Sequence, residues 1–197
     1  DTSDEWITKR TGIKERRISE ENEASSDLGA KAAEVAIQRS GLLKEEIDLV
    51  ICATVTPDYL CMPSTACLIA AKVGLTNVMA YDISAACTGF VYAVSIAKAF
   101  IESGMKKNVL VVGEETYTSI LDYTNKKTYF IFGDGAGAAI ISATSNKDEA
   151  IIDVNCSSDG NYEDLIKTPG GGSKHPCSTE VLENKMACIK MKGNETF

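Results

Sequence analysis

The chain has 197 residues, enough for one substantial hydrophobic core, and its 44% apolar and 24% charged content is typical of a soluble globular protein. A net charge of −8 and a pI near 4.8 argue against binding to nucleic acid or to an anionic membrane surface. The sequence contains no uncharged apolar run of 18 residues and no recognisable signal peptide, so we expect a cytoplasmic protein without a membrane span.

The first predicted elements are a helix and a strand. Apolar residues recur at helical spacing over residues 27–40, where Ser25 or Ser26 can cap the start and Gly41 can stop the helix. Residues 48–55 form a short run rich in Val, Ile and Thr, which predicts a buried strand.

The later elements continue the alternation of helices and strands. They are a helix over 63–74, a strand over 78–83, a helix over 88–102, and strands over 109–113, 136–142 and 151–156. The helix over 88–102 is apolar almost all round, which predicts burial on every side. This order predicts an α/β fold with parallel strands and helices packed on the sheet. The Gly- and Pro-rich stretch 167–176 is typical of a loop.

Cys87 stands where a strand is expected to end and the apolar helix to begin. No charged side chain occurs from Ile83 to Ala97. A helix N-terminus carries a partial positive charge that favours the nucleophilic thiolate, and Gly89 permits the close approach of another backbone or of a ligand. These features indicate a catalytic cysteine. An inert buried cysteine is the alternative.

The cysteine content indicates free thiols. The chain has seven cysteines, an odd number that disulfide pairs alone cannot use up, and it has no C-x-x-C pair. This content fits a reducing compartment. A zinc site needs closely paired ligands, usually with histidine, and His175 is the only histidine. We therefore expect no metal site.

The glycine-rich segment 133–137 has the spacing G-x-G-x-G and is followed by a predicted strand rather than a helix. It therefore lacks the context of a dinucleotide-binding motif, and we expect a structural turn. The glycines at 170–172 lack the G-K-[ST] of a phosphate-binding loop, so we expect a flexible loop there.

Five segments match the motifs of one known enzyme family. They are 2–7 with 10–13, 62–67, 85–90, 132–138 and 191–197. Together they resemble the β-ketoacyl-acyl-carrier-protein synthase III family, thiolase-like enzymes that start fatty acid synthesis. The resemblance implies a thiolase-like α/β fold, of which residues 1–197 form the N-terminal half of an αβαβα layered sandwich. The family's first strand and C-terminal half are not expected in this sequence.

The resemblance also implies site residues. Cys87 becomes the nucleophile, Trp6 stacks on the adenine of coenzyme A, and Arg10 contacts its phosphates or pantetheine. Lys126 stands where the family usually has a second stacking arginine, and without a planar guanidinium we expect weaker stacking. Met62 caps the acyl pocket of a partner subunit. Further substrate contacts are implied for Ile131, Phe132 and Phe197.

Residues 9–17 carry five positive charges and a single glutamate. On an acidic protein this forms a local positive patch, which could hold coenzyme A phosphates or an acidic carrier protein. A solvated surface is the alternative. For Trp6, the alternative to adenine stacking is a role as a core anchor.

The implied reaction is the decarboxylating condensation of a short acyl-coenzyme A, with acetyl expected, and malonyl-acyl-carrier protein through a cysteine acyl-enzyme. The enzyme is expected to be a homodimer that needs no cofactor beyond its thioester substrate. Alternatives are a related synthase of a polyketide or quinolone pathway, or a non-catalytic fragment with a structural cysteine.

The family's catalytic partners of the cysteine are not found in this sequence. They are a histidine in a His-Gln-Ala-Asn run and an asparagine in a Gly-Asn-Thr-Ser run, and neither run occurs here. His175 lies in a loop without matching context, so we do not expect it to be catalytic. We expect this chain to be inactive on its own.

Overall fold

The computed structural model describes residues 3–126 and 128–196 and divides into two compact units. The first, here called the sheet unit, comprises Ser19–Glu115 and Gly135–Ser157. The second, here called the loop-rich unit, comprises Asp1–Ile18, Thr116–Asp134 and Ser158–Phe197. None of the described helices combines the length and apolarity that crossing a bilayer would need.

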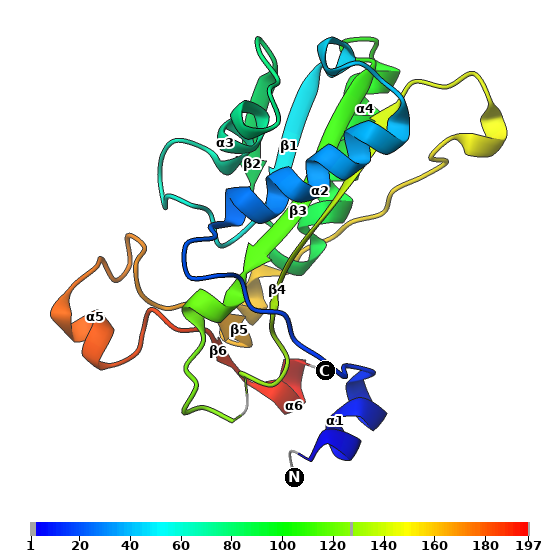
Figure 1. Ribbon diagram of the computed structural model, residues 1–197. Helices are drawn as coiled ribbons and strands as arrows, with labels where there is room; N and C mark the ends of the chain where they lie inside the picture. The colour runs from blue at the N-terminus through cyan, green and yellow to red at the C-terminus, as the bar shows by residue number, and fades with distance from the viewer. Residues whose placement is uncertain (1–2, 127, 197) are drawn as a thin grey trace. The chain divides into compact units, whose positions relative to one another are not determined.

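Most of the sheet unit is built on a four-stranded sheet with the order β2-β1-β3-β4 (Figure 1). The strands are β1 (Leu49–Ala53), β2 (Met79–Ile83), β3 (Asn108–Thr116) and β4 (Asp134–Ser142). The central strand β1 runs parallel to both neighbours, with Ile51 between Tyr81 and Val111. Ala143 N donates to Lys107 O at 2.9 Å, which places the end of β4 beside the start of β3. The predicted parallel α/β core is therefore confirmed, with an antiparallel strand at one edge.

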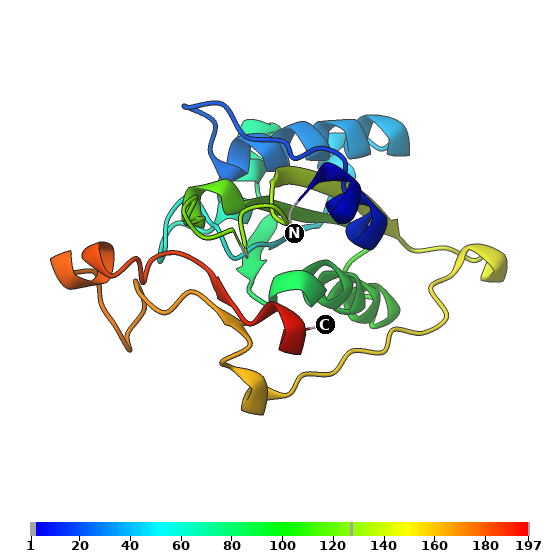
Figure 2. The same cartoon turned by 90° about the horizontal axis from the view of Figure 1, so that it is seen from below.

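Helices cover both faces of this sheet, because every residue of β1 is buried and successive side chains point to opposite faces. Val50 and Cys52 share one hydrophobic cluster with α2 (Ser25–Ser40) and α3 (Thr65–Lys72). Leu49, Ile51 and Ala53 share the other cluster with α4 (Gly89–Glu102). Figure 2 shows α2 and α4 on opposite sides of the sheet.

The start of α2 differs from the prediction. Neither serine caps it, because Ser25 and Ser26 lie inside the first turn, where both are buried. Ala24 occupies the cap position instead, and its N–H donates to the Asp27 carboxylate at 2.9 Å. The stop signal is confirmed, since Gly41 ends the helix with φ 72°.

Two further predictions were wrong. Helix α4 is not buried all round: Gly89, Ala93 and Ala97 are buried, whereas Phe90 and Val91 are 38% and 43% exposed. The reason is that the sheet covers only one side of the helix in the described chain. Residues 151–156 form no strand, because no described strand lies beside them to complete a hydrogen-bonded ladder.

The loop-rich unit contains short elements. They are α1 (Asp4–Thr11), β5 (Ile166–Lys167), α5 (Thr179–Glu183), β6 (Lys190–Met191) and α6 (Gly193–Thr196), with β5 antiparallel to β6. Sequence analysis missed α1 because Ile7 is its only buried residue, so it has almost no apolar periodicity. Its end signals were present: Ser3 caps Trp6 N, and Gly12 adopts φ 73°.

Near the carboxyl end of β3, Glu114 is buried on the face that packs against α2 and α3. It is 2% exposed, and its Oε2 has no hydrogen-bond partner among the described residues. Cys52 Sγ donates to Oε1 at 3.7 Å. Burial raises the pKa of Glu114 to about 7, although hydrogen bonds from Thr54 and Ser25 act in the opposite direction.

This buried carboxyl predicts a stability that depends on pH. Glu114 binds its proton more tightly in the folded state than at its ordinary pKa of 4.5, so stability falls as the pH rises from 4.5 to about 7. The shift corresponds to at most roughly 3 kcal/mol of unfolding free energy. We expect Glu114→Gln to flatten this dependence in thermal unfolding between pH 5 and pH 8. Glu34→Gln on the exposed surface of α2 is the matched control, and an unchanged pH slope in Glu114→Gln would contradict the assignment.

Candidate active site

Cys87 lies on a short turn between β2 and α4, as the sequence predicted. After β2 ends at Ile83, residues Ala86–Thr88 form a 3₁₀ turn, and α4 begins at Gly89. Ala86 has φ 45°, in the left-handed region that non-glycine residues rarely adopt. The Cys87 side chain is exposed. The turn therefore presents a thiol to solvent on a strained backbone, directly before a helix N-terminus.

Close packing fixes the position of this turn against the sheet. A Cβ atom on Gly89 would lie 3.1 Å from Ala53 Cβ, and one on Gly113 would lie 3.1 Å from Phe90 Cδ2. Larger side chains at these glycines would push the first turn of α4 away from β1 and β3. Because both positions are glycine, the residues that follow Cys87 can pack directly on the sheet.

A carboxylate ties together the strand ends beneath the turn. Glu115, the residue after Glu114, accepts from Val55 N at 3.0 Å and from Thr56 Oγ1 at 2.6 Å. Thr54 N in turn donates to Ile83 O at 3.2 Å. These bonds, here called the strand-end clamp, join β3 to β1 and β1 to the end of β2, four residues before Cys87. Burial raises the pKa of Glu115.

The other acidic group near the turn has a structural role. The Asp82 carboxylate accepts from Thr65 N at 2.6 Å and from Ala66 N at 2.7 Å, which caps the start of α3. His175 is exposed, and its carbonyl accepts from Gly171 N at 2.9 Å. The described residues contain no group of three or more His, Cys, Asp or Glu side chains that could hold a metal ion.

The seven cysteines differ in environment, and all are free thiols. Cys52 is fully buried, and burial raises the pKa of its thiol, so it remains protonated. Cys87 is exposed, as are Cys61, Cys67 and Cys177. Exposure alone therefore does not distinguish Cys87 from the other exposed cysteines. Its strained turn and its position directly before α4 distinguish it.

In the loop-rich unit, Trp6 and Arg10 are brought together on α1. The Arg10 guanidinium carbon lies 4.2 Å from the centre of the Trp6 ring, a cation–π contact. Trp6 also meets Phe130 edge-to-face, with ring centres 6.2 Å apart. Trp6 is half-buried, so it packs on Phe130 while part of its surface remains accessible.

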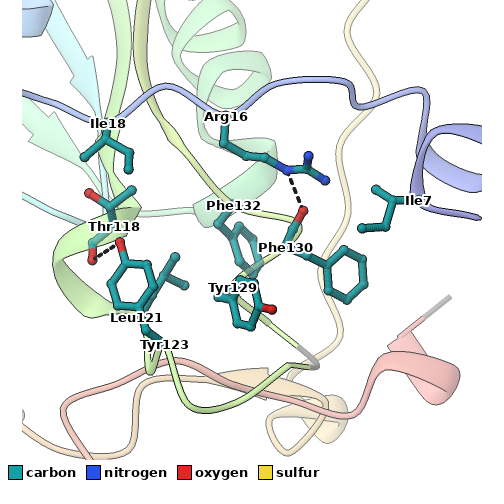
Figure 3. Close-up of a pocket in the computed structure, with 9 residues that line it drawn as sticks. All are labelled: Ile7, Arg16, Ile18, Thr118, Leu121, Tyr123, Tyr129, Phe130 and Phe132. Carbon is teal, nitrogen blue, oxygen red and sulfur yellow. Dashed lines mark hydrogen bonds between the residues drawn. The ribbon is translucent and has the colours of Figure 1, made fainter. Parts of the chain in front are cut away.

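The other predicted contact residues have varied surroundings. Phe132 stacks on Tyr117 with ring centres 5.0 Å apart and borders a cavity of the loop-rich unit (Figure 3). Ile131 is half-buried and Lys126 is exposed. Met62, in the sheet unit, is 78% exposed on the loop between β1 and α3. Phe197 lies outside the described residues.

The structural turn predicted for the glycine-rich segment 133–137 is wrong, because β4 (Asp134–Ser142) already begins at the second residue of the segment. The Asp134 carboxylate accepts from Thr118 N at 2.8 Å and from Thr118 Oγ1 at 2.6 Å. Asp134 N donates to Arg17 O at 2.8 Å. A Cβ on Gly133 would lie 3.1 Å from that same oxygen, so glycine is required for this close approach. Gly135 and Gly137 therefore lie in a strand beside β3, and the segment is a strand start without the helix that a dinucleotide-binding motif needs.

Comparison with known proteins shows which proteins this chain resembles. Residues 81–160 match the profile described as 3-oxoacyl-[acyl-carrier-protein] synthase III. All 197 residues align at 82% identity with 59% of the length of a β-ketoacyl-[acyl-carrier-protein] synthase III from Aliarcobacter butzleri. A relative of the same name from Sulfurovum sp. is 61% identical over 58% of its length. The predicted resemblance to the synthase III family is confirmed.

Solved synthase III structures confirm the thiolase-like fold. The enzyme from Pseudomonas aeruginosa superimposes with a TM-score of 0.86 at 37% identity, covering 100% of this chain and 58% of that one. The enzyme from Aquifex aeolicus gives 0.81 at 41% identity, covering 99% and 57%. The chain therefore spans somewhat under three fifths of the synthase III proteins it matches.

The strand-end clamp predicts an effect of Glu115 on the Cys87 turn. We expect Glu115→Ala to free Val55 N and Thr56 Oγ1 and to speed amide hydrogen exchange over residues 54–56 and 83–88. Glu115→Gln keeps a side-chain oxygen for Val55 N, so we expect it to restore most of the protection. Mass spectrometry of exchanged peptides measures both variants, and equal exchange at 83–88 in Glu115→Ala and the parent would show that the clamp does not hold the turn.

Proposed function

We propose that this chain carries the nucleophile and part of the substrate site of a β-ketoacyl-acyl-carrier-protein synthase III, an acyltransferase that initiates fatty acid synthesis. The observation that carries the proposal is the exposed Cys87 on a strained strand-to-helix turn. The names of the aligned relatives supply the reaction class. Residues 1–197 would form the N-terminal half of the layered sandwich.

The first step would be transfer of an acyl group. The Cys87 thiolate attacks the thioester carbonyl of a short acyl-coenzyme A, the tetrahedral intermediate collapses, and the coenzyme A thiolate leaves. The Cys87 N–H and the α4 N-terminus would stabilise the oxyanion. The product of this half-reaction is an S-acylated Cys87.

The second step would be condensation. Malonyl-acyl-carrier protein loses carbon dioxide, its carbanion attacks the acyl carbonyl on Cys87, and the cysteine leaves as a thiolate. Charge on the malonyl thioester needs stabilising donors, which the family takes from its His-Gln-Ala-Asn and Gly-Asn-Thr-Ser runs. Because neither run occurs in these 197 residues, we propose that this step requires the longer protein.

The loop-rich unit would supply residues that bind the substrates. Trp6 offers an accessible ring for the adenine of coenzyme A, and Arg10 beside it offers a charge for the phosphates. Lys126 is exposed and would add a second cation. Ile131, Phe132 and Phe197 would contact the pantetheine and acyl parts. The reaction would need no cofactor beyond its coenzyme A thioester substrate, and the setting would be the cytoplasm.

The longer protein would act as a homodimer. Strand β2 lies at a sheet edge, and Met79 on it is 46% exposed. An unpaired strand edge is a natural site for pairing with a second copy. The exposed Met62 would then reach the partner's acyl pocket. Sedimentation velocity of the intact protein at micromolar concentration tests this, and a monomer would exclude it.

A polyketide-priming synthase is the second candidate. The priming β-ketosynthase of the R1128 polyketide pathway superimposes with a TM-score of 0.81 at 32% identity. The much higher identity to synthase III relatives favours the fatty acid assignment. The chain length of the acyl group accepted by the intact enzyme discriminates between the two.

Acylation of Cys87 tests the main proposal. We expect the intact enzyme, mixed with acetyl-coenzyme A alone, to gain one acetyl group on the peptide that contains Cys87. Cys87→Ala should remove this adduct and the condensation activity, while Cys177→Ala, at another exposed thiol, should change neither. Peptide mass mapping measures the adduct, and acetylation of another cysteine with Cys87 unmodified would overturn the proposal.

Removal of Trp6 tests the coenzyme A site. We expect Trp6→Ala to raise KM for acyl-coenzyme A by about tenfold with little change in kcat, because the adenine is remote from the reacting bond. Lys126→Arg should bind equally well or better, since it restores a planar partner. Glu5→Ala, on exposed surface of the same helix, is the control. An unchanged KM with a lower Tm would show that Trp6 is only a core anchor.

A further inference from the structure

The loop-rich unit contains a cavity of about 300 Å³ (Figure 3). Its wall is formed by Ile7, Arg16, Ile18, Thr118, Leu121, Tyr123, Tyr129, Phe130 and Phe132. Four of these side chains are aromatic and three are aliphatic, while Arg16 provides the only charge. Of the described residues proposed above to bind coenzyme A or the acyl group, Phe132 alone borders the cavity.

Arg16 has an unused donor at this cavity. Its Nε donates to Phe130 O at 2.7 Å, a bond drawn in Figure 3. Its Nη2 is buried and has no hydrogen-bond partner among the described residues. Burying a charged donor without an acceptor costs free energy, and it costs more than burying a neutral donor. Among the described residues, no carboxylate lines the cavity, so this part of the wall provides no counter-ion for Arg16.

The backbone holds Arg16 firmly in place. The next residue, Arg17, accepts from Asp134 N at 2.8 Å through its carbonyl. A Cβ on Gly133 would lie 3.2 Å from Arg16 Cβ, so the two segments are in close contact. The guanidinium is therefore positioned in advance, which reduces the entropy that a ligand must overcome on binding.

We propose that this cavity is a binding site for a small monocarboxylate with an apolar body. The carboxylate would accept a charge-assisted hydrogen bond from Arg16 Nη2. The apolar body would lie among the rings of Tyr129, Phe130 and Phe132. An alcohol or an amine of the same length lacks the negative charge that Arg16 requires, so it would bind far more weakly.

Calorimetric titration of the intact enzyme with hexanoate tests the proposal, with hexanol and hexylamine as matched probes. We expect hexanoate to bind with a Kd of about 1 mM, reasonable for so small a ligand, and the other two not to bind measurably. Arg16→Gln should weaken hexanoate binding by about tenfold or more. Arg17→Gln is the matched control, because Arg17 is exposed, pairs with Glu15 at 2.8 Å and does not line the cavity.

Two more variants keep the result interpretable. Ile18 is 68% exposed at the cavity, so Ile18→Phe should narrow it and weaken binding without removing the charge or the Arg16–Phe130 bond. Cys87→Ala should leave binding unchanged, which separates this site from the acyl site. Failure of hexanoate to bind, equal binding of hexanol, or full affinity in both Arg16→Gln and Ile18→Phe would overturn the proposal while leaving the assignment of Cys87 untouched.

Discussion

The close approach of α4 to the sheet is the constraint on which the rest of the candidate active site depends. Gly89 allows the helix to begin directly on Ala53, and Gly113 makes room for Phe90. With that contact fixed, the chain has only a few residues in which to leave β2, turn and enter α4. The left-handed backbone of Ala86 follows from this short path, and the turn leaves Cys87 exposed to solvent.

The sequence predicted the core elements well because their signals are local. Strands β1, β2 and β3 each contain an apolar stretch, and α2 has a clear periodicity and a glycine stop. The errors arose where a neighbour decides the outcome. Residues 151–156 have strand-like composition, but a strand exists only when another strand pairs with it. The exposed side of α4 similarly reflects what packs against the helix, which its own residues do not specify.

The candidate site was predictable only in part. The position of Cys87 follows from a predicted strand-to-helix boundary, whereas Trp6 and Arg10 meet through their spacing of four residues on α1, a helix that the sequence did not predict. The roles of Glu115 and Arg16 depend on contacts with residues 59 and 114 positions away in the chain. A cavity and a missing hydrogen-bond partner are properties of the packed structure, which a sequence pattern does not encode.

Two adjacent glutamates show how the fold assigns opposite roles to identical side chains. Glu114 and Glu115 leave β3 on opposite faces because side chains alternate along a strand. The first points between the sheet and helices α2 and α3, where burial raises its pKa and makes its ionised form costly. The carboxylate of Glu115 accepts hydrogen bonds from Val55 N and Thr56 Oγ1, which join the ends of β1 and β3. A shift of one residue in the register of β3 would exchange these roles, so the same pairing that builds the core also places the clamp beneath Cys87.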